Sequence, residues 1–217
     1  MSKKIFLLLT ACTVFLLFVL FSYIVAKEKF NQIDFNNTVK LQDHISRKVD
    51  FPFSLLSIIG SAEITGLFWL GVLIIVFLKR YWLTFFTFFL FWAAHIFEIF
   101  GKTFLLHPAP PHFFYRGFID FNFPSHYVQT DYSYPSGHMM RTSFLAAFLI
   151  LFFYFKANNM VRVTMVLGLV FFLLLMAVSR IYLGEHWTSD VIGGVLLGSS
   201  LGIFTAITLP IKKELKT

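Results

Sequence analysis

Two histidines and an aspartate in the second half of the chain have residue types and spacing suited to covalent catalysis. His186 and Asp190 are four residues apart, so one helical turn would place them on the same face. Asp190 could then hold one ring nitrogen of His186 and leave the other free as a nucleophile. A second histidine, His138, could give a proton to the leaving group. This trio predicts nucleophilic catalysis with general acid assistance.

Cationic and small polar residues accompany the trio and favour an anionic substrate. Lys102 and Arg180 supply fixed positive charge and several hydrogen-bond donors, which suit phosphate. Ser136 and Gly137 stand where a helix would begin, so free N–H groups there would also attract an anion. Gly137 would let the backbone approach a ligand closely. A catalytic metal is the competing interpretation. The histidines show no His-x-x-x-His spacing, so no metal or other cofactor is expected.

Long apolar runs must position these residues. Hydrophobic residues make up 58% of the 217 residues and charged residues 13%, and the mean hydropathy is +0.76. This balance excludes a disordered chain and fits a soluble domain poorly. The runs are continuous, which favours helices over a barrel, and most approach the ~20 residues needed to cross a bilayer. The predicted fold is all-α, a six-span transmembrane helical bundle, with runs at 5–26, 55–78, 81–106, 139–155, 163–178 and 191–211.

The distribution of charge predicts an orientation in the cell membrane. The two chain ends and the two short connections (after the second and fourth runs) hold nine Lys and Arg and one acid, whereas the rest holds nine Lys and Arg and ten acids. The positive-inside rule therefore places both termini in the cytoplasm. The span ends that carry Lys102, His138, Arg180 and His186 then share the outer face, which is the expected active-site face. The net charge of +7 reflects this asymmetry, so no nucleic-acid partner is expected.

The remaining segments divide the chain into two parts. Residues 1–54 would be the first transmembrane helix and an outer loop, and residues 55–217 a five-helix membrane core. The first run continues beyond Cys12, which favours a retained span over a cleaved signal. Residues 27–54 are interpreted as a loop with a surface helix, the alternative being a lid or a substrate-access element. Glycines 194, 198 and 202 predict close helix packing within the bundle rather than dimerisation, and the oligomeric state stays open.

Two segments resemble signatures of the type 2 phosphatidic acid phosphatase superfamily. Pro135-Ser136-Gly137-His138 is similar to the second signature, and Ser179 to Asp190 is similar to the third. They stand in the right order, on the expected span ends, and the resemblance covers roughly residues 55–211.

This resemblance implies a metal-independent phosphatase with a six-span core. It makes His186 the nucleophile that becomes phosphohistidine, with Asp190 orienting it and His138 protonating the leaving oxygen. It assigns the binding of the phosphate group to three further positions, which are Arg180, Ser136 and the Gly137 N–H.

The first signature departs from the family pattern of Lys, six residues, then Arg-Pro. Lys102 is followed at that distance by Ala109-Pro110, so the arginine is missing. Three residues could replace it. Arg141, three residues after His138, is favoured, with a contact to the substrate tail or an interfacial position as its alternatives. Arg116 lies in the same outer loop, and His107 could contribute a weaker donor.

Carboxylates near these cations are expected to orient them. Glu98 lies four residues before Lys102, the favourable order on a helix, and would keep Lys102 charged and aimed. Packing in the bundle is the alternative role for Glu98, and Glu63 is a weaker candidate. Glu185, next to His186, is expected to point elsewhere and meet solvent.

The expected function is hydrolysis of a lipid phosphate or diphosphate in the bilayer. The family offers undecaprenyl diphosphate, phosphatidylglycerol phosphate and phosphatidic acid, and the sequence does not choose among them. One alternative keeps the phosphohistidine and passes the phosphoryl group to another lipid or sugar. The other is a non-catalytic lipid-binding membrane protein, which the missing arginine suggests and the retained histidines and Asp190 oppose.

Overall fold

The protein is described by a computed structural model over residues 3–119, 123, 124 and 132–210, and every regular element in these ranges is helical. In chain order the elements are α1 (Lys3–Ala26), α2 (Asn31–His44), η1 (Arg47–Val49), α3 (Asp50–Ile59), α4 (Ala62–Leu78), α5 (Trp82–Thr87), α6 (Leu90–Phe104), η2 (His112–Phe114), α7 (Gly137–Lys156), α8 (Asn159–Tyr182) and α9 (Thr188–Ala206).

The spans agree with the six apolar runs. Five helical segments are long and apolar enough to cross a membrane, one of them formed by α5 and α6 together, and α3 with α4 makes a sixth if counted as one bent unit. The predicted all-α transmembrane bundle is therefore confirmed. The fifth span is longer than its predicted run of 163–178, because Asn158 caps α8 through a 3.0 Å bond from the Val161 N–H.

The second span is bent, which its apolar run did not reveal. The segments 47–59 and 62–78 meet at 51°. Ser61 begins α4, since its hydroxyl accepts a 3.3 Å bond from the Ile64 N–H. Gly60, at the bend, lies against His138: a side-chain carbon there would stand 2.9 Å from the Cδ2 atom of that ring. The bend itself therefore lies beside the start of α7, while α3 packs against α8.

Helices α7 and α9 form the centre of the bundle. Both are largely buried, whereas α1 and α8 expose most of their apolar surface, as lipid-facing helices do. Gly194, Gly198 and Gly202 of α9 lie directly on the main chain of α7, and a side chain at any of them would collide with α7 carbonyl oxygens. The predicted glycine packing within the bundle is confirmed, and it fixes the starts of α7 and α9 next to each other.

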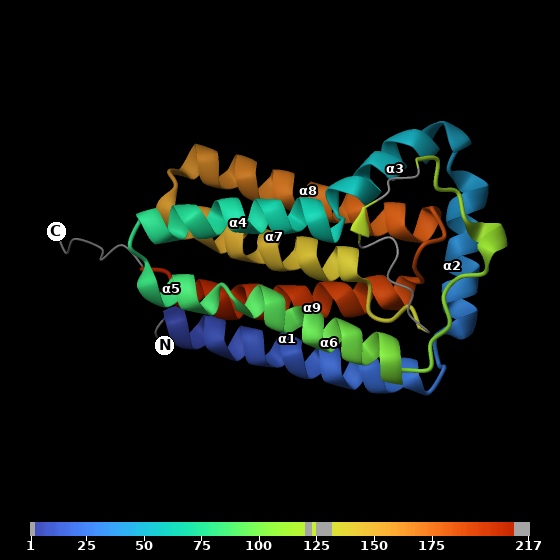
Figure 1. Ribbon diagram of the computed structural model, residues 1–217, viewed down its shortest axis with the longest axis horizontal. Coiled ribbons are helices and arrows are strands. Elements are labelled where there is room, and N and C mark those ends of the chain that lie inside the picture. The colour runs from blue at the N-terminus through green and yellow to red at the C-terminus, as the bar shows by residue number, and fades with distance from the viewer. Residues whose placement is uncertain (1–2, 120–122, 125–131, 211–217) are drawn as a thin grey trace.

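One end of the bundle is closed by a helix that lies across it. Figure 1 shows α2 running across the ends of the spans, while α1 begins and α9 ends at the opposite end. Residues 27–54 do contain the expected surface helix, but α2 is tied down. The Gln42 amide donates to the carbonyls of Phe114 and Tyr182, at 2.7 and 2.8 Å. The cytoplasmic placement of both termini and the division at residue 54 stay predictions.

Candidate active site

His186 and Asp190 meet at the turn between α8 and α9. Asp190 lies in the first turn of α9, where its Oδ2 atom accepts a 2.9 Å bond from the Trp187 N–H. The same oxygen lies 3.4 Å from His186 Nδ1. Because Asp190 occupies the Nδ1 side of the ring, Nε2 is the nitrogen left for chemistry. The expected contact is made, although His186 precedes α9 and the two residues are not joined by a helical turn.

The start of α7 lies against the start of α9. Ser136 caps α7, where its hydroxyl accepts from the Met139 N–H at 3.5 Å, and its own N–H donates to the Asp190 carbonyl at 3.0 Å. His138 follows in the first turn, with its ring centre 6.4 Å from that of His186. The two segments that resemble family signatures therefore form one site, with an imidazole on each side of it.

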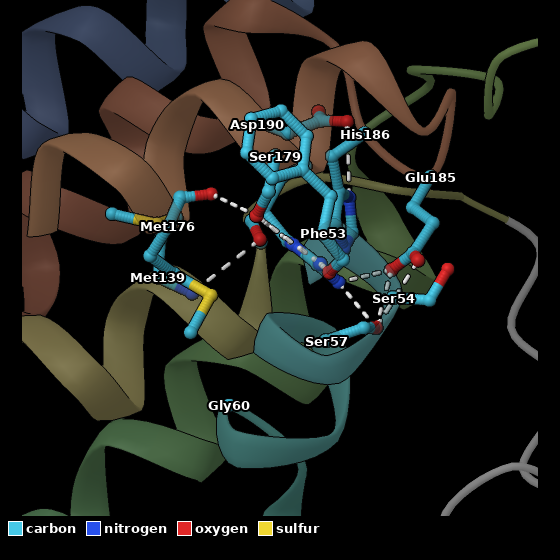
Figure 2. A network of polar contacts seen from close by, with 12 residues as sticks. Phe53, Ser54, Ser57, Gly60, Met139, Met176, Ser179, Glu185, His186 and Asp190 are labelled. Atoms are coloured by element: carbon cyan, nitrogen blue, oxygen red, sulfur yellow. Dashed lines mark hydrogen bonds and ion pairs between the residues drawn. The ribbon is translucent and has the colours of Figure 1, made fainter. Parts of the chain in front are cut away.

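Arg180 is fully buried at the end of α8, and α3 holds it there. Its Nη1 atom contacts Ser57 and Glu185, and its Nη2 atom donates to the Phe53 carbonyl at 3.4 Å. Nε and Nη2 also donate to the Ser179 hydroxyl, at 3.3 and 3.2 Å. Figure 2 shows Ser57 and Glu185 together at one end of this network, with His186 and Asp190 beside it.

The prediction that Glu185 faces solvent was wrong. Its carboxylate forms an ion pair with Arg180 and accepts from the Ser57 hydroxyl at 3.1 Å through both oxygens. The reason is that residue 185 precedes α9 and lies in the turn, so helical spacing from His186 does not apply to it. Ser57 was also missed, although a serine inside an apolar run is a signal that could have marked it.

Lys102, Glu98 and Arg141 form a second polar cluster, between α6 and α7. Glu98 binds Lys102 Nζ at 2.9 Å, which confirms the predicted pairing of these two side chains. Its other oxygen lies 3.4 Å from Arg141 Nη1. A side chain at Gly137 would overlap the Glu98 carboxylate and displace it from its present position. The approach of the Gly137 backbone to a ligand stays a prediction.

The residues suggested as replacements for the missing arginine occupy three different places. Arg141 is buried, with Nη2 donating to the Gly60 carbonyl at 3.3 Å and Nε without a hydrogen-bond partner among the described residues. Arg116 donates to the Gln42 carbonyl at 3.1 Å and lies over the Tyr182 ring. The replacement of the arginine by Arg141 stays a prediction. Glu63 lies in the first turn of α4, just after the bend.

His107 lies inside the protein, next to the aspartate of the site. Its Nε2 atom is 3.0 Å from the Ser189 hydroxyl, 3.4 Å from Asp190 Oδ1 and 3.8 Å from Asp34 Oδ2. Asp34 comes from α2 and was not singled out in the sequence. Burial raises the pKa of the Asp34 carboxyl, against hydrogen bonds from Ser189 and the charge of His107 that lower it.

Within the described residues, no group of three or more His, Cys, Asp or Glu side chains is arranged to hold a metal ion. Metal independence stays a prediction. The fold and site together define a multi-pass helical membrane protein with a histidine–aspartate pair and a second histidine at one end of the bundle.

Comparison with known proteins identifies the family. The model of the PAP2 superfamily matches residues 82–213, more than half of the chain, and the chain belongs to this superfamily. It is 34% identical over 120 residues to an undecaprenyl-diphosphatase of Sulfolobus acidocaldarius, covering 54% of this chain and 45% of the relative. It is 34% identical over 74 residues to phosphatidylglycerophosphatase B of Bacillus subtilis, covering 32% and 36%. The chain thus spans less than half the length of these curated relatives.

A solved structure shares the fold. The crystal structure of a transmembrane PAP2-type phosphatidylglycerolphosphate phosphatase from Bacillus subtilis superposes with a TM-score of 0.69. The alignment covers 90% of this chain and 93% of the other at 17% sequence identity. This similarity establishes the bundle architecture beyond the segment that the family model matches.

Proposed function

We propose that the protein is a membrane phosphatase that hydrolyses a lipid phosphate or diphosphate through a phosphohistidine at His186. The observation that carries the proposal is the arrangement of the two imidazoles. Asp190 lies on the Nδ1 side of His186, and the ring of His138 is centred 6.4 Å away. A phosphoryl group between the rings would meet a nucleophile on one side and a proton donor on the other.

The reaction would proceed in two half-reactions. In the first, Nε2 of His186 forms a bond to phosphorus while the bond to the leaving oxygen breaks, and protonated His138 gives its proton to that oxygen. In the second, water attacks phosphorus, the phosphorus–nitrogen bond breaks, and His138 takes the proton of the water. Asp190 would stabilise the positive charge that develops on the His186 ring.

The phosphoryl oxygens would be bound by groups from three helix ends. Arg180 at the end of α8 and Lys102 near the end of α6 supply positive charge, while Ser136 and the Gly137 N–H lie at the start of α7. A helix start favours an anion through its free N–H groups and its dipole. Arg141, which contacts Glu98, stays a candidate to replace the arginine that the first signature lacks.

The position of the site suits a lipid substrate. It lies at one end of a bundle whose outer helices are apolar, so the head group could reach the site while the tail stays in the bilayer. With the orientation predicted from charge, this end faces outward and both termini are cytoplasmic. The names of the relatives support diphosphate and phosphatidylglycerol phosphate head groups, and undecaprenyl diphosphate is the first substrate to test.

One assay tests the proposal. Purified protein is given undecaprenyl diphosphate, phosphatidylglycerol phosphate and phosphatidic acid in detergent without divalent metal, and phosphate release is measured. We expect release from at least one lipid, and a loss of at least about 10³-fold in His186→Ala. His112→Ala, at an exposed histidine of η2, is the matched control and should keep full activity. No release from any lipid, or release that a chelator abolishes, would contradict the proposal.

A further inference from the structure

The helix that closes the end of the bundle sends a carboxylate into the protein. Asp34 of α2 is 1% exposed, and both of its oxygens are used by Ser189, a residue 155 positions later in the chain. Oδ1 accepts the Ser189 N–H at 2.8 Å, and Oδ2 accepts the Ser189 hydroxyl at 2.6 Å. Burying a carboxylate is costly, so this contact needs a role.

The first bond makes Asp34 a cap for α9, supplied by another helix. Ser189 lies in the first turn of α9, where N–H groups have no partner within the helix. An acidic side chain at this position satisfies one N–H and interacts favourably with the helix dipole. Because α9 also carries Asp190, the next residue, Asp34 fixes the backbone from which the catalytic aspartate projects.

The second bond determines the hydrogen-bonding state of His107. The single hydroxyl hydrogen of Ser189 is donated to Asp34, so this hydroxyl can only accept from His107 Nε2. Nε2 therefore carries a hydrogen, and the other polar atoms near it are carboxylate oxygens of Asp190 and Asp34. The Nε2–H group is directed into a cluster of acceptors within the protein.

This arrangement also brings the His107 N–H group close to Asp190. Its Oδ2 atom faces His186 and the Trp187 N–H, whereas its Oδ1 atom has no hydrogen bond within standard geometry among the described residues. His107 Nε2 lies 3.4 Å from Oδ1 and places its N–H group beside this oxygen. A donor there opposes rotation of the carboxylate, and rotation would withdraw Oδ2 from His186.

The loop that carries His107 is fixed as well. The N–H and the hydroxyl of Ser133 donate to the His107 carbonyl at 3.0 and 3.1 Å, three residues before Ser136. His107 is 2% exposed, so neither ring nitrogen is available to a substrate phosphate. The titratable groups around it are Asp34 from α2, Asp190 from α9 and the edge-on ring of Tyr134, 6.4 Å away.

We propose that Asp34 and His107 are positioning residues for the pair of His186 and Asp190. Asp34 caps the helix that carries Asp190 and, through the Ser189 hydroxyl, holds His107 Nε2–H against the free oxygen of Asp190. The chain of contacts runs from α2 through Ser189 and His107 to the proposed nucleophile. This inference rests on the proposed role of His186, and it removes His107 from the candidates for the missing arginine.

Steady-state kinetics in detergent micelles, with the lipid of the panel that wild type hydrolyses fastest, test the inference. We expect His107→Leu to lower kcat about 10- to 100-fold, by analogy with the loss of a hydrogen-bond partner of a metal ligand, with KM changed less than about twofold. His107→Gln keeps an N–H donor and should recover most of the rate. The isosteric variant Asp34→Asn should lower kcat about 10-fold. It tests the same inference if His107→Leu does not fold. His112→Leu and Asp43→Asn, at exposed positions of η2 and α2, are the matched controls.

A second measurement does not depend on the lipid. Diethyl pyrocarbonate modifies free imidazole nitrogens, and mass spectrometry reports the modification rate of His186 itself. We expect this rate to fall in His107→Leu and Asp34→Asn and to stay unchanged in the controls. If wild type releases no phosphate from any lipid, the proposed function fails, while slower modification of His186 in the variants still supports positioning. A higher KM at constant kcat, or an unchanged modification rate, would overturn the inference.

Discussion

Two buried carboxylates, Glu98 and Asp34, lie close to the residues of the candidate site, and their partners differ. Glu98 bridges two cations, Lys102 at 2.9 Å and Arg141 at 3.4 Å. Asp34 accepts from the neutral N–H and hydroxyl of Ser189, with the nearest imidazole nitrogen at 3.8 Å. Glu98 therefore balances charge between α6 and α7, whereas Asp34 fixes the direction of hydrogen bonds at the start of α9.

The difference in partners predicts that Glu98 contributes mainly to the stability of the fold and Asp34 mainly to the geometry of the site. Without Glu98, the buried guanidinium of Arg141 would lose its ion pair and keep only the weaker influence of Glu63, and breaking a buried ion pair is among the most costly defects a fold can carry. Without the charge of Asp34, the neutral donors of Ser189 lose a strong acceptor but leave no stranded ion. The first change should act mainly on folding and the second mainly on the rate of reaction.

The largest expected effect is on stability. Glu98→Ala leaves Arg141 buried without its ion pair, and we expect a loss of about 3 kcal/mol, seen as a strongly lowered melting midpoint in detergent. Asp43→Ala, at an exposed carboxylate of α2, is the control. A midpoint shift no larger than that of the control would show that the cluster of Glu98, Lys102 and Arg141 does not stabilise the bundle.

The next effect is on the rate. Ser189→Ala removes the hydroxyl that joins Asp34 to His107 and keeps the N–H that Asp34 caps. Loss of one hydrogen bond of about 1 kcal/mol predicts a kcat about fivefold lower, with a small change in the melting midpoint. Kinetics and melting of the same preparation are compared. If the midpoint fell as far as in Glu98→Ala while kcat held, the distinction between the two carboxylates would fail.

The smallest effect is a dependence on pH. Because burial raises the pKa of Asp34 above its ordinary value of 3.8, the folded state holds this proton more tightly than the unfolded state. The free-energy cost of burying the ionised Asp34 carboxylate is fully present above the pKa of the folded state. It disappears as the pH falls toward the pKa of the unfolded state. Wild type should therefore gain melting temperature relative to Asp34→Asn as the pH is lowered from about 7 to about 4. The wild-type midpoint minus the Asp34→Asn midpoint is followed across this range, with Asp43→Asn as reference, and a value that stays constant or falls as the pH is lowered would contradict the assignment.

The two carboxylates also differ in how far the sequence predicts them. Glu98 and Lys102 lie on one helix, so a spacing of four residues was enough to pair them. The contact between Asp34 and Ser189 joins residues 155 positions apart, and nothing distinguishes Asp34 from the other polar residues of α2. The contact of His186 with Asp190 was also expected, but its reason differs, because His186 precedes α9 and lies in the turn that Asp190 caps through the Trp187 N–H.

Where the prediction failed, the chain leaves helical geometry or bends. Glu185 lies in a turn, so its direction could not be taken from its neighbours. The bend at Gly60 and Ser61 brings Ser57 to Arg180, although the apolar run continues through it. Arg141 was placed correctly near the start of α7, but spacing along one helix does not determine which neighbouring helix a side chain faces.

The cap that α2 provides for α9 limits the modularity of the protein. The segment that the family model matches, residues 82–213, contains both histidines, Asp190 and Ser189, yet the carboxylate that receives the Ser189 N–H comes from residue 34. A chimera that joins residues 55–217 to a foreign first span would keep every residue of both signatures and lose that carboxylate. Transplanting this site therefore means transplanting α2 with it.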